Sequence, residues 1–186
     1  LESEKGERLA QALAAGWQAL QTDDSGSAIT FFETAIAIED DNESALEGLE
    51  RARVRPALLQ LMEEGEIARS NDDLQNAQVA FLKAVELDRA YEPASIALLE
   101  TTDQITGLAF ADSMSRALSA MDAHQISTAE KALREAASLK PDEQVVRDTQ
   151  QQLTRLKQKL WLASQRQKGI NDEQNENWSG AVAVYR

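Results

Sequence analysis

The sequence contains no cysteine and a single histidine, His124, among its 186 residues. The lack of cysteine excludes disulfide bridges, thiolate metal sites and thiol catalysis. His124 lies in a polar turn, and no serine, aspartate or lysine is placed in a recognisable nucleophile motif, which excludes a catalytic triad and a histidine-based metal site. We therefore predict that the chain is not an enzyme and uses no cofactor or metal. An enzyme would need a catalytic domain outside this stretch.

Residues that break helices or favour strands are scarce as well. The chain has 3 prolines, 8 glycines and only 5% aromatic residues, so it offers little material for a β-sheet. Alanine, leucine, glutamate and glutamine dominate instead. The composition predicts an all-α protein.

Long apolar runs are also absent. No stretch approaches the roughly 20 apolar residues that cross a bilayer, and no signal peptide opens the chain. The 32 acidic residues outnumber the 19 basic ones and give a formal net charge of −13, so the phosphates of a nucleic acid would be repelled. We expect no nucleic-acid partner and no direct membrane contact.

The acidic residues form clusters, but their spacing does not indicate a site. One cluster lacks the spacing of a calcium-binding loop, and the other falls on a helix surface. We interpret both as solvated acidic faces; they are Glu39, Asp40, Asp41 and Glu43, and then Glu63, Glu64 and Glu66.

The ends of the sequence indicate a fragment. The chain starts at Leu1 rather than at a methionine, and it stops at Arg186 inside an amphipathic pattern, 178–185, with no helix-ending signal after it. We interpret it as a piece of a longer protein. A cytoplasmic and a periplasmic location both stay open.

An internal repeat organises what is present. A motif of small, large apolar and small residues occurs four times, at spacings of 49, 52 and 52 residues: Ala28-x3-Phe32-x2-Ala35, Ala77-x3-Phe81-x2-Ala84, Ala129-x3-Leu133-x2-Ala136 and Ala181-x3-Tyr185. Each copy follows a polar turn and lies 12 residues after a small residue, which is Gly16, Gly65, Ala117 and Gly169 in turn. Small residues let two antiparallel helices approach closely while the large residue fills the next layer. The pattern predicts helical hairpins near 9–40, 58–89 and 110–141, and part of a fourth at 162–186.

This pattern resembles the tetratricopeptide repeat (TPR), in which a small residue precedes an alanine, an aromatic residue, an alanine and a proline; the proline is matched only by Pro141. The resemblance implies a single solenoid domain over 1–186, a right-handed superhelix of hairpins. That family repeats about every 34 residues, so each unit here is 15 to 18 residues longer, in segments 43–54, 93–105 and 142–160. Either each unit carries a third helix, or one helix of about 25 residues and about 38 Å joins consecutive hairpins. We expect a mixture, because Pro56 should break the first connector whereas 142–168 contains neither proline nor glycine.

The resemblance also implies a protein-binding scaffold whose partner, a protein or peptide, lies in a concave groove lined by the first helix of each hairpin. Overlaying the repeats places the groove at Leu13, Trp17 and Leu20, then Met62, Glu66 and Arg69, then Met114, Leu118 and Met121. Methionine and tryptophan suit an adaptable apolar surface, although the same side chains would also serve as core between helices. The lysine, asparagine and arginine with which some family members grip a C-terminal carboxylate are replaced here by leucine, methionine and tryptophan.

One segment reverses the acidic charge. Residues 149–168 contain no acidic side chain and carry Arg155, Lys157, Lys159, Arg166 and Lys168, with Trp161 among them. The segment is either the solvated back of a buried helical seam or a docking edge for an acidic partner, which could be a second copy. The alternative function is therefore a structural spacer or self-assembly element. By analogy with the family, the parent protein would be a membrane-anchored or envelope protein of a bacterium.

Overall fold

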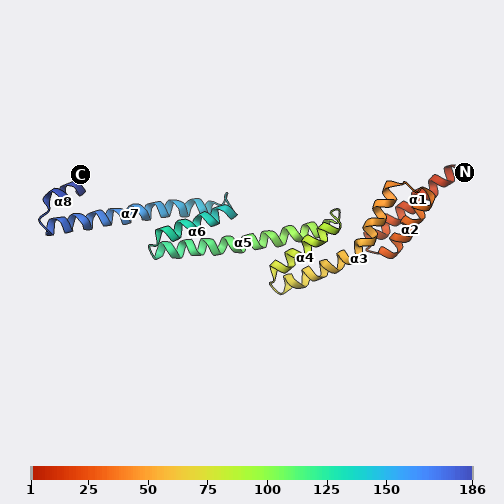
Figure 1. Cartoon of the computed structure of the whole chain (residues 1–186), viewed down its shortest axis with the longest axis horizontal. Helices are drawn as coiled ribbons and strands as arrows, with labels where there is room; N and C mark the ends of the chain where they lie inside the picture. The colour runs from red at the N-terminus through yellow and green to blue at the C-terminus, as the bar shows by residue number, and fades with distance from the viewer. Residues whose placement is uncertain (1, 186) are drawn as a thin grey trace. The chain divides into compact units, whose positions relative to one another are not determined.

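The computed structural model describes the backbone of residues 2–185 and the side chains of residues 2–184. Every regular element in this range is an α-helix, so the all-α prediction is confirmed (Figure 1). Arg186 and the side chain of Tyr185, both assigned to the fourth hairpin, lie outside the described part. The helices are α1 (Glu2–Gln21), α2 (Ser25–Ile38), α3 (Glu43–Ser70), α4 (Leu74–Leu87), α5 (Glu92–Asp122), α6 (Ile126–Leu139), α7 (Gln144–Gln174) and α8 (Trp178–Tyr185).

The helices form two compact units, residues 1–105 and 106–186, whereas the sequence predicted one repeat domain. The first unit holds α1 to α4 and the first half of α5, and the second holds the rest of α5 with α6, α7 and α8. The boundary thus lies inside a continuous helix.

The same turn ends each long helix before a short one. Its central residue takes the left-handed conformation, with φ between 55° and 60°, and the next residue donates its N–H to the carbonyl five residues earlier, as Asp24 does to Ala19 at 3.0 Å. This Schellman motif satisfies carbonyls that a helix end leaves free. The central residues are Asp23, Asp72, His124 and Glu176, at the spacings of the sequence repeat.

The residue after the left-handed position begins the next helix. Asp24 and Asp73 cap α2 and α4, because their side chains accept hydrogen bonds from the N–H groups of Ser27 and Asn76 at 3.0 and 3.2 Å. The hydrogen bonds from Ser27 lower the pKa of Asp24. At the same place before α6, Gln125 makes no capping hydrogen bond.

Single long helices join the hairpins, which decides between the two alternatives for the connectors. Helices α3, α5 and α7 contain 28, 31 and 31 residues, so 31 residues span about 46 Å. The expected break at Pro56 was wrong, since this residue lies within α3. Proline removes one backbone hydrogen bond, but buried residues on both sides of it, Ala52 and Leu58, belong to packed clusters. Packing on both sides keeps the helix continuous.

In the first unit, each short helix lies between two halves of long helices. The ring of Phe32 in α2 is fully buried and contacts Gly16 of α1 and Gly48 of α3, where an added Cβ at Gly16 would come within 2.7 Å of the ring. Phe81 of α4 is likewise buried, against Gly65 of α3 and in a cluster with Ala97 of α5. Each ring occupies space that a larger residue on the long helices would fill.

The second unit repeats this arrangement with a smaller side chain. Leu133 of α6 takes the place of phenylalanine, and the facing position of α5 is Ala117 instead of glycine. Both belong to one buried cluster with Val146 and Leu153 of α7. In the last hairpin, Gly169 of α7 and Ala181 of α8 are buried. The sizes are therefore complementary: the larger phenylalanine on a short helix faces glycine, and the smaller leucine faces alanine.

We predict that Gly65→Ala destabilises the protein by about 1–2 kcal/mol. Its Cβ would overlap the ring of Phe81, and overpacking outweighs the gain in helix propensity. Chemical denaturation measures the change. Gly107→Ala is the control, since nothing lies within 4 Å of its added Cβ, and it should stabilise by about 0.5–1 kcal/mol. The combination with Phe81→Leu should recover part of the loss; an additive double variant would contradict the size match.

We also predict that Gln125→Asp stabilises the protein by about 1 kcal/mol, because an aspartate at this position caps α2 and α4 and the glutamine caps nothing. Thermal unfolding gives the measurement. Gln125→Ala is the comparison and should change stability by less than about 0.5 kcal/mol. Equal stability of the aspartate and alanine variants would show that the cap does not form.

Candidate functional site

The first predicted groove set joins α1 to α3. Trp17 is half-buried: its Nε1–H donates to Ser44 Oγ at 3.1 Å, and its ring meets that of Phe32 edge to face at a centroid distance of 5.1 Å. The guanidinium of Arg51 lies 5.4 Å from the centroid of the indole ring. Leu13 is half-buried and Leu20 is buried. These three side chains therefore mainly make contacts between helices of the chain itself.

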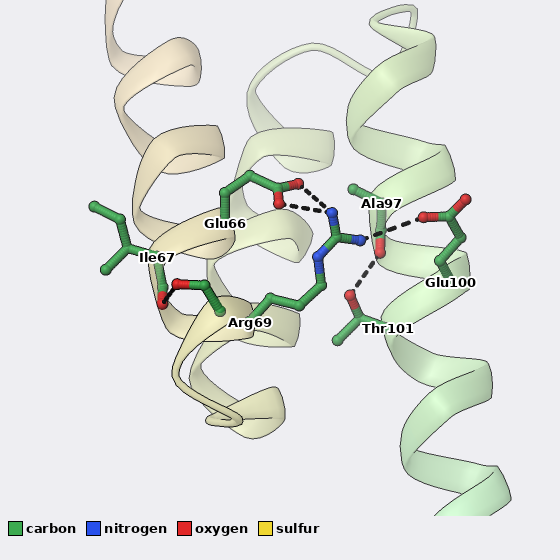
Figure 2. A network of polar contacts seen from close by, with 7 residues as sticks. Glu66, Ile67, Arg69, Ala97, Glu100 and Thr101 are labelled. Atoms are coloured by element: carbon green, nitrogen blue, oxygen red, sulfur yellow. Dashed lines mark hydrogen bonds and ion pairs between the residues drawn. The ribbon is translucent and has the colours of Figure 1, made fainter.

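The second set lies on α3 and is centred on Arg69. Figure 2 shows its guanidinium between two carboxylates, Glu66 of α3 at 2.6 Å and Glu100 of α5 at 3.3 Å. The hydrogen bond with Glu66 raises the pKa of Arg69 most, and the guanidinium also lies 5.8 Å from the ring centroid of Phe81. Met62 packs half-buried against the cores beside α4. What this set exposes is a polar surface with one guanidinium between two carboxylates.

The third set lies in the second unit. Met114 is buried and Met121 is half-buried in the main cluster of that unit, whereas Leu118 is exposed to 44%. Leu118 is thus the one large apolar residue of the nine groove positions that is exposed. The binding role of all nine stays a prediction.

The predicted basic edge lies on α7, and all five of its cations are exposed. Lys157 donates to Glu130 of α6 at 2.6 Å, and this hydrogen bond lowers the pKa of Glu130. Helical periodicity sorts the edge into two rows, each with an exposed apolar residue among the cations. One row is Lys157, Trp161 and Lys168, and the other is Arg155, Lys159, Leu162 and Arg166.

Sequence reasoning did not single out the most exposed aromatic surface. Two residues of α7 and two of α8 are exposed to between 50% and 64%. We call them the C-terminal apolar surface: Trp161, Leu162, Trp178 and Val182. Beside it, between α7 and α8, lies an open hollow of about 440 Å³, lined by Trp161, Lys168, Asp172, Asn177, Gly180 and Val184 among others. The sequence has only 3 tryptophans, and this rarity was the signal that could have drawn attention to Trp161 and Trp178.

A buried arginine also escaped prediction. Arg55 of α3 is 3% exposed, and its Nε and Nη1 atoms have no hydrogen-bond partner. Its nearest carboxylates are those of Asp23 at 3.6 Å and of Asp88 at 3.9 Å, and its guanidinium lies 4.4 Å from the ring centroid of Tyr91. The buried Asp88 accepts a hydrogen bond from Arg51 Nε at 3.0 Å. Burial is the main cause of the raised pKa of Tyr91.

Within the described residues, no helix is long and apolar enough to cross a membrane. In the same range, no three histidine, aspartate or glutamate side chains gather in a group that could hold a metal ion.

The arginine network leads to a prediction about stability. Asp88→Ala should cost about 3 kcal/mol, because it removes the buried carboxylate that faces both Arg51 and Arg55 and leaves the buried Arg55 with only the partly exposed carboxylate of Asp23. Arg55→Met should change stability by less than about 1 kcal/mol, since Nε and Nη1 of Arg55 are already without hydrogen bonds and methionine can still pack on Tyr91. Denaturant unfolding of both variants tests this. A larger loss in Arg55→Met than in Asp88→Ala would contradict it.

Comparison with known proteins supports the repeat. Residues 61–91, which comprise the end of α3, all of α4 and the turn before α5, match the family model described as the tetratricopeptide repeat. No curated protein and no solved structure matches the chain. This family generally mediates protein–protein interaction and is typically a non-enzymatic scaffold. The match confirms the resemblance drawn from the spacing of small and aromatic residues: residues 61–91 are similar to a tetratricopeptide repeat.

Proposed function

We propose that the chain is a protein-binding scaffold and that its partner binds the C-terminal apolar surface. The observation that carries the proposal is the exposure of Trp161, Leu162, Trp178 and Val182, each at 50% or more. Single exposed apolar residues are normal on protein surfaces, but a group with two tryptophans on adjoining helices is typical of an interaction site.

The chemistry of this surface suits a protein partner. Tryptophan and arginine are enriched among the residues that carry most of the binding energy in interfaces. The two rows of α7 place an exposed Trp161 and Leu162 among cations such as Lys168 and Arg166. An apolar anchor flanked by cations favours a partner with apolar side chains and acidic neighbours.

The distribution of charge along the chain supports an acidic partner. Residues 1–105 carry 22 acidic and 8 basic side chains, whereas residues 106–186 carry 10 acidic and 11 basic ones. The large negative charge thus belongs to the first unit, and the second unit is close to neutral with its cations gathered on α7. Charge complementarity would speed association and select against basic partners.

The predicted groove positions would offer separate, secondary contacts within each unit. Leu118 is accessible, and the Arg69 network of Figure 2 offers polar groups for hydrogen bonds. Leu20 and Met114 would contribute through packing of the scaffold, because they are buried.

The test compares three forms of the chain as baits in affinity capture from a cell lysate. The wild type should retain a partner that the double variant Trp161→Ala/Trp178→Ala loses, because both side chains are exposed and their removal leaves the core intact. Leu99→Ala is the matched control: this residue is 70% exposed in the first unit, and its loss should leave capture unchanged. Circular dichroism verifies that all three are equally helical.

Equal capture by the wild type and the double tryptophan variant would refute this binding surface. Loss of capture in Leu99→Ala as well would show that the effect is not specific to the C-terminal apolar surface.

A further inference from the structure

The first hairpin, α1 with α2, has an open hollow on one side. The hollow measures about 310 Å³, and both helices line it: Arg8, Ala12, Ala15, Phe31, Thr34 and Ile38 among others. We call it the α1–α2 hollow. None of the nine predicted groove positions belongs to its lining, and it is distinct from the C-terminal apolar surface on α7 and α8.

Apolar side chains form most of the α1–α2 hollow. Ala12 is buried, and Ala15 and Ile38 are half-buried. Phe31 is 38% exposed, whereas its neighbour Phe32 is fully buried in the core. Because Ala12 and Ala15 are small, the chain itself does not fill the space beside the ring of Phe31.

The openness of this side is not an effect of the start of the sequence. The second hairpin consists of the second half of α3 with α4, lies 49 residues further along, and has helices before and after it. At the positions of Arg8, Thr34 and Ile38 it carries three exposed residues, which are Ala57, Lys83 and Leu87. An inner hairpin thus leaves the same side open, so the exposure belongs to the repeat.

The other two hairpins fill this side with polar side chains. At the place of Ala15 the second hairpin has Glu64, which accepts a hydrogen bond from Gln60 at 2.9 Å. The third hairpin has Arg116 at that place, and its guanidinium donates to Glu135 at 2.8 Å. The alanine of the first hairpin makes no such bridge and leaves the α1–α2 hollow in its place.

The short helices differ in the opposite sense. At the place of Phe31, the second and third hairpins carry alanines, Ala80 and Ala132, which are 8% and 2% exposed. Only α2 therefore places a large, partly exposed aromatic side chain at this position among the three.

Two cations border the α1–α2 hollow. Arg8 lines it, and Lys5 lies one turn earlier on α1. Both are exposed, and among the described residues neither forms an ion pair. Arg51 and Arg69 of the same unit, in contrast, are paired with carboxylates. The two cations of α1 are thus available to a carboxylate of a partner.

Size and charge together define the occupant. A volume of about 310 Å³ lies at the lower end of the roughly 300–1,000 Å³ of small-molecule sites, and an open hollow suits one side chain of a protein better than a whole small ligand. The first unit carries 22 acidic and 8 basic side chains, so it would repel a strongly acidic segment. A partner therefore needs one carboxylate beside its apolar side chain, and not a run of them.

We propose that the α1–α2 hollow is a second binding site, for a protein segment that inserts one large apolar side chain beside Phe31 and places one carboxylate against Arg8. The apolar side chain supplies most of the affinity, because it removes the exposed part of the Phe31 ring from water. The ion pair with the exposed Arg8 supplies mainly selectivity. This site goes beyond the proposed function, since it lies in the first unit and does not require the C-terminal apolar surface.

The test selects peptides from a display library of random short sequences on the intact chain. Selection on the double variant Arg8→Ala/Phe31→Ala runs in parallel. The variant should fold like the wild type, because the second hairpin carries alanine at both positions, Ala57 and Ala80, and circular dichroism verifies this. Peptides enriched on the wild type over the variant should carry a large apolar residue with an aspartate or glutamate within one helical turn of it.

The most enriched peptide is then labelled and titrated by fluorescence anisotropy. Phe31→Ala should weaken its binding at least about tenfold, because the apolar contact is lost. Arg8→Ala should weaken it about threefold and remove most of the salt dependence that the wild type shows between about 50 and about 500 mM salt. Leu87→Ala is the matched control, since Leu87 is 40% exposed on the same side of the second hairpin, and it should leave the affinity unchanged.

Four results would overturn the inference. They are no peptide enriched on the wild type over the double variant, enriched peptides without an acidic residue, equal affinity of Phe31→Ala and the wild type, and a loss of affinity in Leu87→Ala as large as in Phe31→Ala. Enriched peptides that are basic belong to the second result, and they would show that the overall charge of the first unit governs binding.

The outcome is separable from that of the proposed function. Trp161→Ala/Trp178→Ala should bind the selected peptide as tightly as the wild type does, because neither tryptophan lines the α1–α2 hollow. Weaker binding by this variant would assign the peptide to the C-terminal apolar surface and overturn the inference. If capture from the lysate depends on the two tryptophans and no peptide is selected on the α1–α2 hollow, the scaffold stands and the second site is rejected.

Discussion

The close contact between a large side chain on α2, α4 and α6 and a small residue on the long helices governs this structure. Phe32 meets Gly16 and Gly48, and Phe81 meets Gly65. The ring of Phe32 lies between Gly16 of α1 and Gly48 of α3, so α2 packs against a long helix on two sides. The chain achieves this by giving each inner long helix two halves with different tasks. The first half covers one short helix, and the second half forms a hairpin with the next.

This division of tasks explains the long spacing of the repeats and the continuity of the helices. The additional 15 to 18 residues are the covering halves, so α3 runs through Pro56 without a break. The division of the long helices into two halves also relates the stability of the hairpins to the exposure of possible binding residues. Where both sides of a short helix are covered, its apolar residues are core; on α8, Trp178 and Val182 are exposed.

Much of the fold could be predicted from the sequence because its signals are local. The motif around Phe32, Phe81 and Leu133 and the polar turns before it located the hairpins, and the fixed distance of 12 residues identified their partner helices. The site could be predicted less well. Trp17 was assigned to a groove, yet it contacts Ser44 and Arg51 of α3. Whether one face of a helix is exposed depends on a second helix that lies far away in the sequence. The local pattern of apolar residues does not identify that second helix.

The sequence by itself determined the all-helical class, the repeat and its period, and the segment with reversed charge. These follow from propensity, periodicity and composition, which act over one or two helical turns. Only the tertiary structure decided that the connectors are single helices, that Arg55 is buried between Asp23 and Asp88, and that the exposed aromatic surface lies on α7 and α8. Burial arises when two segments that are distant in the sequence pack together. The local pattern of apolar residues shows that a residue can be buried. The neighbours of that residue in the folded structure decide whether it is buried.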